Sequence, residues 1–432
     1  MIFSEAFRSL RTDKTRAFFY WLTLLLTTVF MYLYFNIAMD ESIGMSLGQT
    51  SNNIIVIVTL ISVIICALDI FFANDYYTRI KAFDLAIRLV SGATYLHIAG
   101  FLLIQTVFLM VLAVPPGVLI AKLMMKPLNI LFSSVLPGLY DMAPVREGVI
   151  YTYVVLGFII VWMVVMNLSF TYLNSASQLV NQRNAAGRRK GSGFYMKSVP
   201  AWLRQLFWLF LFVMPVVTFY LNRDAIVLFS CIGMVGFNGA LQWIIVPMIS
   251  RILSSGKADP VRTAWLGFVR EDLQAMKFAM YLLLVSVVIM ASILMTHQQN
   301  PLESVVITLS YGFLSVLQAM ALMFRCSNIL SSRVRHFASL ARIGFTYKQL
   351  KEITRKEVFG YYGSVLLICL LYLVNIFISL RMAGQIETGF AVFLVLIVAV
   401  PLIVCACINL FYYRKTVLSN MTEKEFEDDS AS

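Results

Sequence analysis

Residues 390–410 read FAVFLVLIVAVPLIVCACINL and contain no acidic or basic side chain. An α-helix needs about 20 mostly apolar residues to cross about 30 Å of hydrocarbon. Comparable apolar stretches recur along the chain, for example at 18–38 and 53–73, and the charged residues gather in the short segments between them. This pattern predicts an all-α membrane protein with about ten transmembrane helices.

The composition of the chain agrees with a membrane protein. Apolar residues make up 60% of the chain and charged residues only 13%, whereas soluble domains carry about 25% charge. A net charge of +12 would suit nucleic acid in a soluble protein, but the excess of Lys and Arg in cytoplasmic loops explains it more simply. We therefore expect the basic residues to contact the headgroups of membrane lipids, and we expect no nucleic-acid partner. The six cysteines lie in or beside apolar stretches without metal-ligand spacing, so we expect buried thiols and no metal site.

The distribution of charge predicts that both termini lie in the cytoplasm. The first apolar stretch follows a basic segment and has no small-residue cleavage site behind it, so we expect a retained helix. The segment 39–52 is acidic and lacks Lys and Arg, which suits the outer side. The loop 123–147 is the largest surface expected outside, and the acidic tail 416–432 is expected to be disordered.

Two sequence patterns occur twice, in the same order. The segments 7–16 and 268–277 alternate apolar and basic residues directly before an apolar stretch, which is typical of an amphipathic helix in the headgroup plane. The basic residues expected at the membrane surface are Arg8, Arg11, Lys14, Arg16, Arg270 and Lys277.

The second pattern aligns residues 81–95, KAFDLAIRLVSGATY, with residues 333–347, RVRHFASLARIGFTY. Each predicts a short cytoplasmic helix that ends at a glycine with positive φ, followed by a threonine that caps the next helix. We therefore predict duplicated four-helix units at 1–175 and 262–415, which flank a two-helix insert at 176–261.

These segments resemble the FtsX/MacB-type permease domain of ABC transporters. The arrangement of four, two and four helices is similar to the BceB-like branch, whose ten-helix members serve antimicrobial-peptide resistance and sensing. That branch carries a large extracellular domain between helices seven and eight, where this chain has only 297–302. The resemblance implies a bacterial plasma membrane location.

The resemblance also implies a partner and a mechanism. A separate cytosolic ATPase, acting as a dimer with Mg-ATP, would dock on the two short helices, because the chain itself has no phosphate-binding Gly-x-x-x-x-Gly-Lys-Ser/Thr motif. The chain would then be no enzyme by itself and would bind no cofactor directly. The residues expected to couple to the ATPase are Lys81, Phe83, Leu85, Arg88, Leu89, Gly92, Arg335, Phe337, Leu340, Arg342, Gly344 and Phe345. The alternative is that the basic residues among them only bind lipid headgroups.

Two outcomes of such coupling stay open at this point. The chain would export or extract an antimicrobial peptide or lipid-like amphipathic substrate, or it would pass motion to a membrane partner such as a sensor histidine kinase without transport. A secondary transporter and an intramembrane enzyme are less well supported. The apolar stretches hold few charges, and the three histidines lie far apart with no other catalytic motif.

Several residues inside the apolar stretches have expected structural roles. Pro115, Pro116 and Gly117 are predicted to break the third helix and to act as a hinge. Deep polar residues such as Asn167 and Asn409 are predicted to form hydrogen bonds between helices, worth about 0.6 kcal/mol each. Five glycines are predicted to allow close helix packing: Gly233, Gly236, Gly239, Gly360 and Gly363.

Overall fold

The computed structural model describes residues 2–40, 49–135, 144–173, 200–221, 226–254, 259–296, 301–384 and 386–415. Every regular element in these ranges is helical, which confirms the predicted all-α class. Ten helices within the same ranges are long and apolar enough to cross a membrane. The predictions for 41–48, 136–143, the basic segment 174–199, 297–300 and the tail 416–432 lie outside the described residues.

The long helices include single elements and one composite span. Nine of the candidate spans fall in α2 (Lys14–Met39), α4 (Gln49–Ile80), α6 (Tyr95–Val135), α7 (Arg146–Leu173), α9 (Ala201–Leu221), α13 (Lys277–Thr296), α14 (Pro301–Ser332), α16 (Tyr347–Met382) and α17 (Thr388–Tyr413). The remaining span runs from α10 (Ile226–Ala240) through a π-helical turn, η1 (Leu241–Ile245), into α11 (Val246–Ser254). The shorter or more polar helices are α1 (Ile2–Thr12), α5 (Ala82–Val90), α12 (Pro260–Ala275) and α15 (Val334–Arg342).

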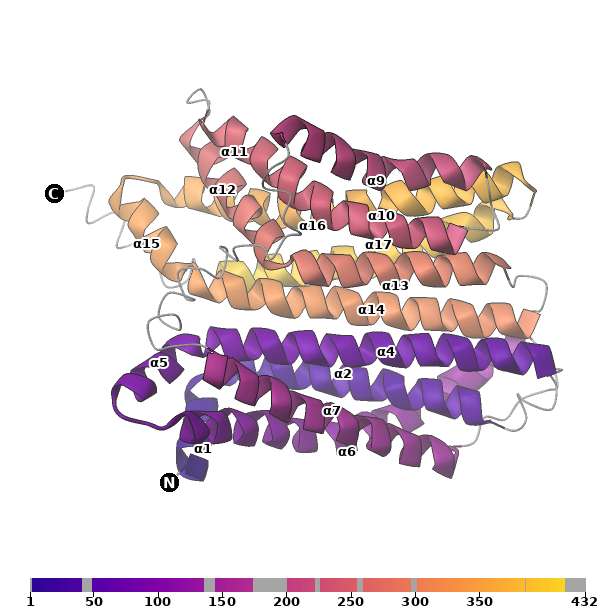
Figure 1. Ribbon diagram of the computed structural model, residues 1–432, viewed down its shortest axis with the longest axis horizontal. Coiled ribbons are helices and arrows are strands. Elements are labelled where there is room, and N and C mark those ends of the chain that lie inside the picture. Colours follow the sequence, from indigo (N-terminus) through magenta and orange to yellow (C-terminus); the bar gives the residue numbers. More distant parts are fainter. Residues whose placement is uncertain are drawn as a thin grey trace. The chain divides into compact units, whose positions relative to one another are not determined.

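The chain forms two compact units, which Figure 1 shows as groups of elongated helices. Unit 1 comprises Met1–Ala186 and Ile293–Leu317, and unit 2 comprises Gly187–Ser292 and Gln318–Ser432. The boundaries at residues 175 and 261 were predicted from the repeated sequence patterns, whereas the two units are defined by compactness. The predicted duplication therefore stays a prediction.

In unit 1, helix α2 is central and packs against α4, α6 and α7. The rings of Tyr20 in α2 and Tyr77 in α4 stack with their centroids 4.7 Å apart. Farther along α2, the ring of Phe30 stacks on Phe313 at 5.1 Å. Apolar side chains gain little by leaving lipid for a helix interface, so helices in a membrane associate mainly through close packing. These aromatic pairs supply such packing.

The prediction that Pro115, Pro116 and Gly117 break the third helix is wrong. Helix α6 runs from Tyr95 to Val135 with Pro115, Pro116 and Pro127 inside it. Prolines inside apolar helices are tolerated where neighbouring elements support the freed backbone groups, and α2 packs along α6 here. A Cβ added to Gly117 would lie 3.0 Å from Cβ of Thr28, so this glycine allows close packing of the two helices. A hinge role for the three residues stays a prediction.

In unit 2, α9 and α10 pack closely through glycines. A Cβ added to Gly236 would lie 2.5 Å from the backbone of Leu211, and one on Gly239 would lie 2.0 Å from the ring of Trp208. Gly233 would similarly meet Tyr372 and Pro215. The predicted role of these three glycines is confirmed, because a Cβ there would overlap the backbone of α9 or the rings of Trp208 and Tyr372. It is also confirmed for Gly360, where a Cβ would lie 3.1 Å from Val269, but it is wrong for Gly363, where a Cβ would have nothing within 4 Å.

The π-helical turn in the same pair of helices has a local cause. Pro247 has no N–H, so the carbonyl oxygen of Trp243, four residues earlier, receives no helical hydrogen bond from it. Nε2 of Gln205 in α9 donates to that oxygen at 3.2 Å, and the guanidinium of Arg204 lies 3.7 Å from the centroid of the Trp243 ring. The polar end of α9 therefore supports the irregular backbone.

Candidate functional site

Two nine-residue helices, α5 in unit 1 and α15 in unit 2, each join two long helices. We call α5 with its flanking turns, residues 81–94, the α5 corner, and α15 with its turns, residues 333–346, the α15 corner. Each corner begins at a cation, Lys81 or Arg333, and its short helix is followed by a glycine with positive φ: +94° at Gly92 and +101° at Gly344. Few other residues adopt this conformation readily, so the predicted glycine ends are confirmed.

The threonines that follow the glycines cap the next helices as predicted. Oγ1 of Thr346 accepts from the backbone N–H of Gln349 at 3.4 Å, while the Gln349 side chain accepts from the Thr346 N–H at 2.9 Å. In unit 1, Oγ1 of Thr94 accepts from the N–H of His97 at 3.3 Å. Caps of this kind stabilise a helix end by about 1 kcal/mol, so the direction of each corner is set locally.

The side chain of Arg333 is buried among groups from α12 and α16. Its Nη2 lies 2.5 Å from Oδ1 of Asp272 and donates to the carbonyl oxygen of Phe268 at 3.2 Å. Its Nη1 lies 2.7 Å from Oε1 of Glu357, and the guanidinium carbon lies 4.3 Å from the centroid of the Phe268 ring. One guanidinium therefore links the corner to both helices.

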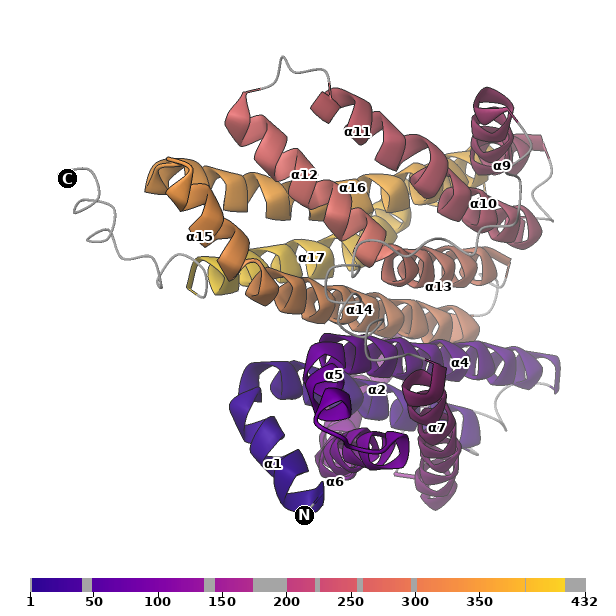
Figure 2. The same cartoon turned by 60° about the vertical axis from the view of Figure 1, so that its left-hand side comes forward.

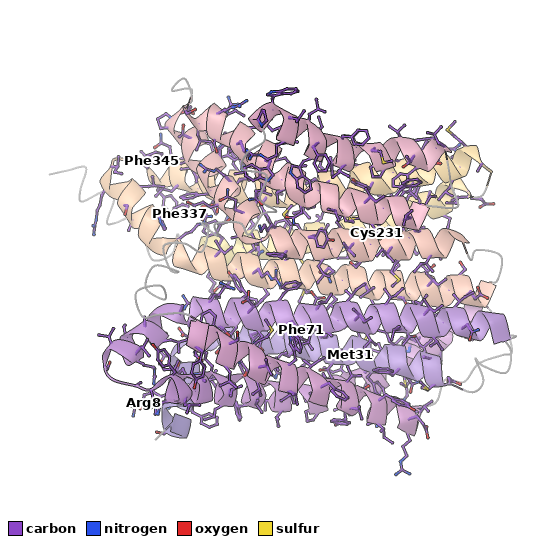
Figure 3. The ribbon with its side chains drawn as sticks, in the orientation of Figure 1. Arg8, Met31, Phe71, Cys231, Phe337 and Phe345 are labelled. Carbon is purple, nitrogen blue, oxygen red and sulfur yellow. The ribbon has the colours of Figure 1, made fainter. Side chains whose placement is uncertain are left out.

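Helix α17 joins the same cluster through Tyr413. The Tyr413 hydroxyl donates to Oε2 of Glu357 at 2.9 Å, and its ring packs edge-on against Phe337 of α15 at 5.7 Å. Phe337 also stacks on Phe268 at 5.8 Å. Figure 3 shows Phe337 and Phe345 at the end of unit 2 where α15 turns. We call Phe268, Asp272, Arg333, Phe337, Glu357 and Tyr413 the Arg333 cluster.

The charges in this cluster perturb one another. Burial raises the pKa of Asp272 to about 6, although the neighbouring Arg333 opposes the shift. Burial alone would lower the pKa of Arg333, but Asp272 and Glu357 outweigh it and raise that pKa above its usual range. The guanidinium is thus permanently charged, and breaking its ion pairs would leave buried carboxylates without a counter-charge.

The α5 corner is tied to α1 by a corresponding set of contacts. Nζ of Lys81 donates to Oγ of Ser9 at 2.8 Å and lies 3.7 Å from Oδ2 of Asp13. Nη1 of Arg88 lies 2.5 Å from Oε2 of Glu5, and the Arg88 guanidinium lies over the ring of Phe101 at 4.1 Å. Figure 2 shows α1 crossing the end of unit 1 beside α5 and α6.

Burial also perturbs this corner. It lowers the pKa of Lys81 to about 8, with Asp13 acting in the opposite direction. The hydrogen bond from Arg88 lowers the pKa of Glu5. Gln105 of α6 completes the link, because its Nε2 donates to the carbonyl oxygen of Ala6 at 3.0 Å.

Polar residues deeper in each unit bond to one another. In unit 1, Oδ1 of Asn167 in α7 accepts from Asn74 at 3.0 Å and from Thr78 at 3.2 Å, both in α4. In unit 2, Oδ1 of Asn409 in α17 accepts from Ser327 in α14 at 2.6 Å, and its Nδ2 donates to Tyr362 in α16 at 2.6 Å. The predicted interhelical hydrogen bonds of Asn167 and Asn409 are confirmed.

The structure separates the predicted coupling residues into buried and accessible ones. Lys81, Leu85 and Phe337 are fully buried within their own units, so they position the corners and present no surface to a partner in this conformation. This corrects the expectation that they lie on the contact surface. Arg88, Leu89, Leu340 and Phe345 are partly exposed, and Gly92, Arg342 and Gly344 are exposed. The side chains of Phe83 and Arg335 lie outside the described residues.

Three exposed apolar residues at the corners were missed. Val90 and Ile343 are both 75% exposed and stand next to the ends of α5 and α15, and Ile87 is 52% exposed one turn earlier. A helical projection of the short segments would have placed Ile87 and Val90 on one face, since residues three apart are neighbours on a helix. Exposed apolar residues at a turn are better contact candidates than the buried ones.

The basic residues predicted for the membrane surface have different environments. Arg8, Arg11 and Lys14 are exposed, whereas Arg16, Arg270 and Lys277 are partly buried. Figure 3 places Arg8 at the end of unit 1. Arg16 lies 3.8 Å from Asp13. Contact with lipid headgroups stays a prediction for all six.

The chain matches no protein-family model, and no curated protein is significantly similar to it. Within the described ranges, no three His, Cys, Asp or Glu side chains come together in a way that could hold a metal ion.

Proposed function

We propose that this chain is the membrane-spanning permease subunit of an ATP-driven transporter of the FtsX/MacB type, and that a dimeric cytosolic ATPase moves it through the α5 and α15 corners. The observation that supports this most directly is the shared construction of the corners. In each, the first residue is a buried cation hydrogen-bonded to the helix that directly precedes the first long helix of the proposed four-helix unit. A force applied to the corner would therefore act on two long helices and on that preceding helix together.

Corresponding contacts also support the duplicated organisation. Ser9 stands five residues before Lys14, and Asp272 stands five residues before Lys277, so the partners of Lys81 and Arg333 occupy equivalent positions. The buried residue four positions after each cation is apolar: Leu85 after Lys81, and Phe337 after Arg333.

The deep asparagines add a further correspondence. Asn167 and Asn409 lie in the last long helix of each proposed four-helix unit, and each bonds to the second and third long helices of that unit. Since hydrogen bonds within a membrane specify which helix faces meet, equal bonds at equal places favour a common origin for the two units.

The side chains in the long helices favour an amphipathic substrate that the protein binds from the lipid bilayer. The deep asparagines described above are hydrogen-bonded within their own units, as expected of packing groups. Helix α9, in contrast, exposes large apolar side chains such as Leu206, Phe210 and Val217 along its length. We propose an antimicrobial peptide or a lipid-like molecule as the substrate, with a plasma membrane location in bacteria.

The second candidate is mechanical signalling to a membrane partner such as a sensor kinase. The deep asparagines favour signalling over secondary transport, because they are hydrogen-bonded inside the units. A secondary transporter would usually expose polar or broken helices near the midplane. Growth of a deletion strain on a panel of cell-wall-active peptides separates the two candidates. Unchanged sensitivity to every peptide would remove the transport proposal.

The coupling proposal is tested by co-purification of an ATPase from native membranes. We expect Val90→Gln combined with Ile343→Gln to abolish co-purification, because these side chains are the most exposed apolar groups at the corners. Leu221→Gln combined with Met382→Gln is the matched control. These two apolar residues are about as exposed as Val90 and Ile343, but they are the last residues of α9 and α16 and belong to neither corner. Full retention of the ATPase by the corner variant would mean that the contact lies elsewhere.

A further inference from the structure

A row of cations continues from the α15 corner along the first turns of α16. Lys348, Lys351 and Arg355 are all exposed, and their spacing of three and four residues places them within an arc of about 60° on a helix. We call these three residues the α16 stripe. None of them is in an ion pair with another residue of the described ranges. Glu352 lies beside the stripe but is bound to Lys356 at 2.6 Å.

The α5 corner has no such row. The positions of α6 that correspond to the stripe, counted from Tyr95 and Tyr347, are Leu96, Ala99 and Leu103. The stripe is therefore not part of the construction that the two corners share. A general excess of cations in cytoplasmic loops would not place three of them on one face of one helix.

The length of α16 indicates what the stripe meets. The helix has 36 residues, but its uncharged part begins at Val358 and runs to Leu380, which is enough to cross the hydrocarbon. At 1.5 Å per residue, Lys348 lies about 15 Å before Val358 along the helix. The headgroup layer is only about 5–8 Å thick on each side, so Lys348 and Lys351 extend beyond it. This favours an acidic polypeptide over lipid headgroups.

The chain itself contains a suitable acidic segment. Residues 423–429 read EKEFEDD, with five carboxylates and one lysine. Helix α17 ends at Tyr413, which is hydrogen-bonded to Glu357 of α16, so the chain leaves α17 next to α16, on the side of that helix opposite the stripe. The seven residues 416–422 can span about 23 Å when extended. Lys348 lies about 14 Å from Glu357 along α16 and on the other face of a helix about 10 Å wide, so the segment reaches the stripe by passing around α16.

We propose that the acidic segment 423–429 binds the α16 stripe. Opposite charge and the reach of the chain both support this occupant, and its local concentration is high because it is tethered. If the proposed function is correct, the bound segment covers part of the surface next to the α15 corner and competes with the ATPase there. The binding itself does not depend on that function.

The test uses the full-length protein without any ATPase. Exposed Cys231 and Cys407 are replaced by Ser, the other four cysteines are buried, and Ser430→Cys carries a spin label that leaves every charge of the acidic segment in place. We expect slow label motion at low salt. Raising the salt to 1 M shortens the Debye length from about 10 Å at 0.1 M to about 3 Å, and it should release the label.

Two sets of substitutions decide the assignment. Lys348→Gln, Lys351→Gln and Arg355→Gln together should release the label at low salt. Arg8→Gln, Arg11→Gln and Lys14→Gln remove the same number of exposed cations from α1 and the start of α2, and they should leave the label slow. A label that is already mobile in the native chain, or one that the stripe substitutions do not release, would overturn the proposal. A label that is slow in neutral vesicles but mobile in vesicles with anionic lipid would mean that headgroups occupy the stripe in a membrane, and it would overturn the proposal for that setting. Because no ATPase is present, the result stands whether or not the coupling proposal holds.

Discussion

Oε1 of Glu357 in α16 lies 2.7 Å from Nη1 of Arg333, and both side chains are almost completely buried. The contact joins the first third of α16 to the first residue of the α15 corner, while the other arm of the guanidinium binds Asp272 in α12. Charge pairs in a buried setting are held firmly, because separating them leaves desolvated charges without a counter-charge. Movement of α15 is therefore mechanically linked to α12 and α16.

Loss of the guanidinium should severely destabilise unit 2. We expect Arg333→Met to lower the free energy of unfolding by about 3–5 kcal/mol, because Asp272 and Glu357 would lose their shared counter-charge. Thermal unfolding of the purified protein in detergent measures this. Adding Asp272→Asn and Glu357→Gln to Arg333→Met should recover part of the loss, and a triple variant as unstable as the single one would show that charge is not the cause.

The α5 corner should respond to pH through Lys81. Its pKa is lowered by burial to about 8, while an unfolded lysine titrates near 10.4. Between these two values the unfolded chain binds more protons than the native one, so this group makes stability rise with pH across the interval, by up to about 3 kcal/mol.

Comparison with Lys81→Met isolates that contribution. The difference in unfolding temperature between the native protein and Lys81→Met should change between pH 8 and pH 10 and stay constant below pH 7. A constant difference across the whole range would mean that Lys81 titrates as an ordinary exposed lysine.

Close packing of α9 on α10 should make Gly236 intolerant of any side chain. A Cβ there would lie 2.5 Å from the backbone of Leu211, so we expect Gly236→Ala to cost about 1–3 kcal/mol, as overpacking does. Gly363→Ala is the control, because nothing lies within 4 Å of a Cβ at that exposed position in α16. Alanine there should be neutral or stabilise the helix by up to about 1 kcal/mol. Unfolding temperatures of the two variants give the comparison, and equal values would contradict the packing argument.

The proposed duplication makes a prediction about sidedness. Val90→Cys and Ile343→Cys, each in a chain without Cys231 and Cys407, should react with an impermeant thiol reagent from the same, cytoplasmic side of the membrane. Met39→Cys, at the far end of α2 and 37% exposed, should react from the other side. Reaction of the two corner positions from opposite sides would remove the basis for two equivalent corners.

The sequence alone was sufficient for features that depend on neighbouring residues. The apolar runs predicted the ten long helices, because the length and composition of a segment decide whether it can cross hydrocarbon. Gly92, Gly344 and Thr346 were identified because a positive φ and a helix cap are properties of a few consecutive residues. The glycines of α10 were also found, since only the smallest residue permits such an approach.

Only the tertiary structure decided which side chains face inward. Lys81 and Arg333 looked like ordinary cytoplasmic cations, yet both are buried beside partners about 60 to 70 residues away in sequence. The helix-breaking prediction for Pro115 and Pro116 failed for a related reason, since the neighbours of a proline decide whether a helix continues through it. Burial and ion pairing depend on which distant helix faces meet, and no local pattern in the chain specifies that meeting.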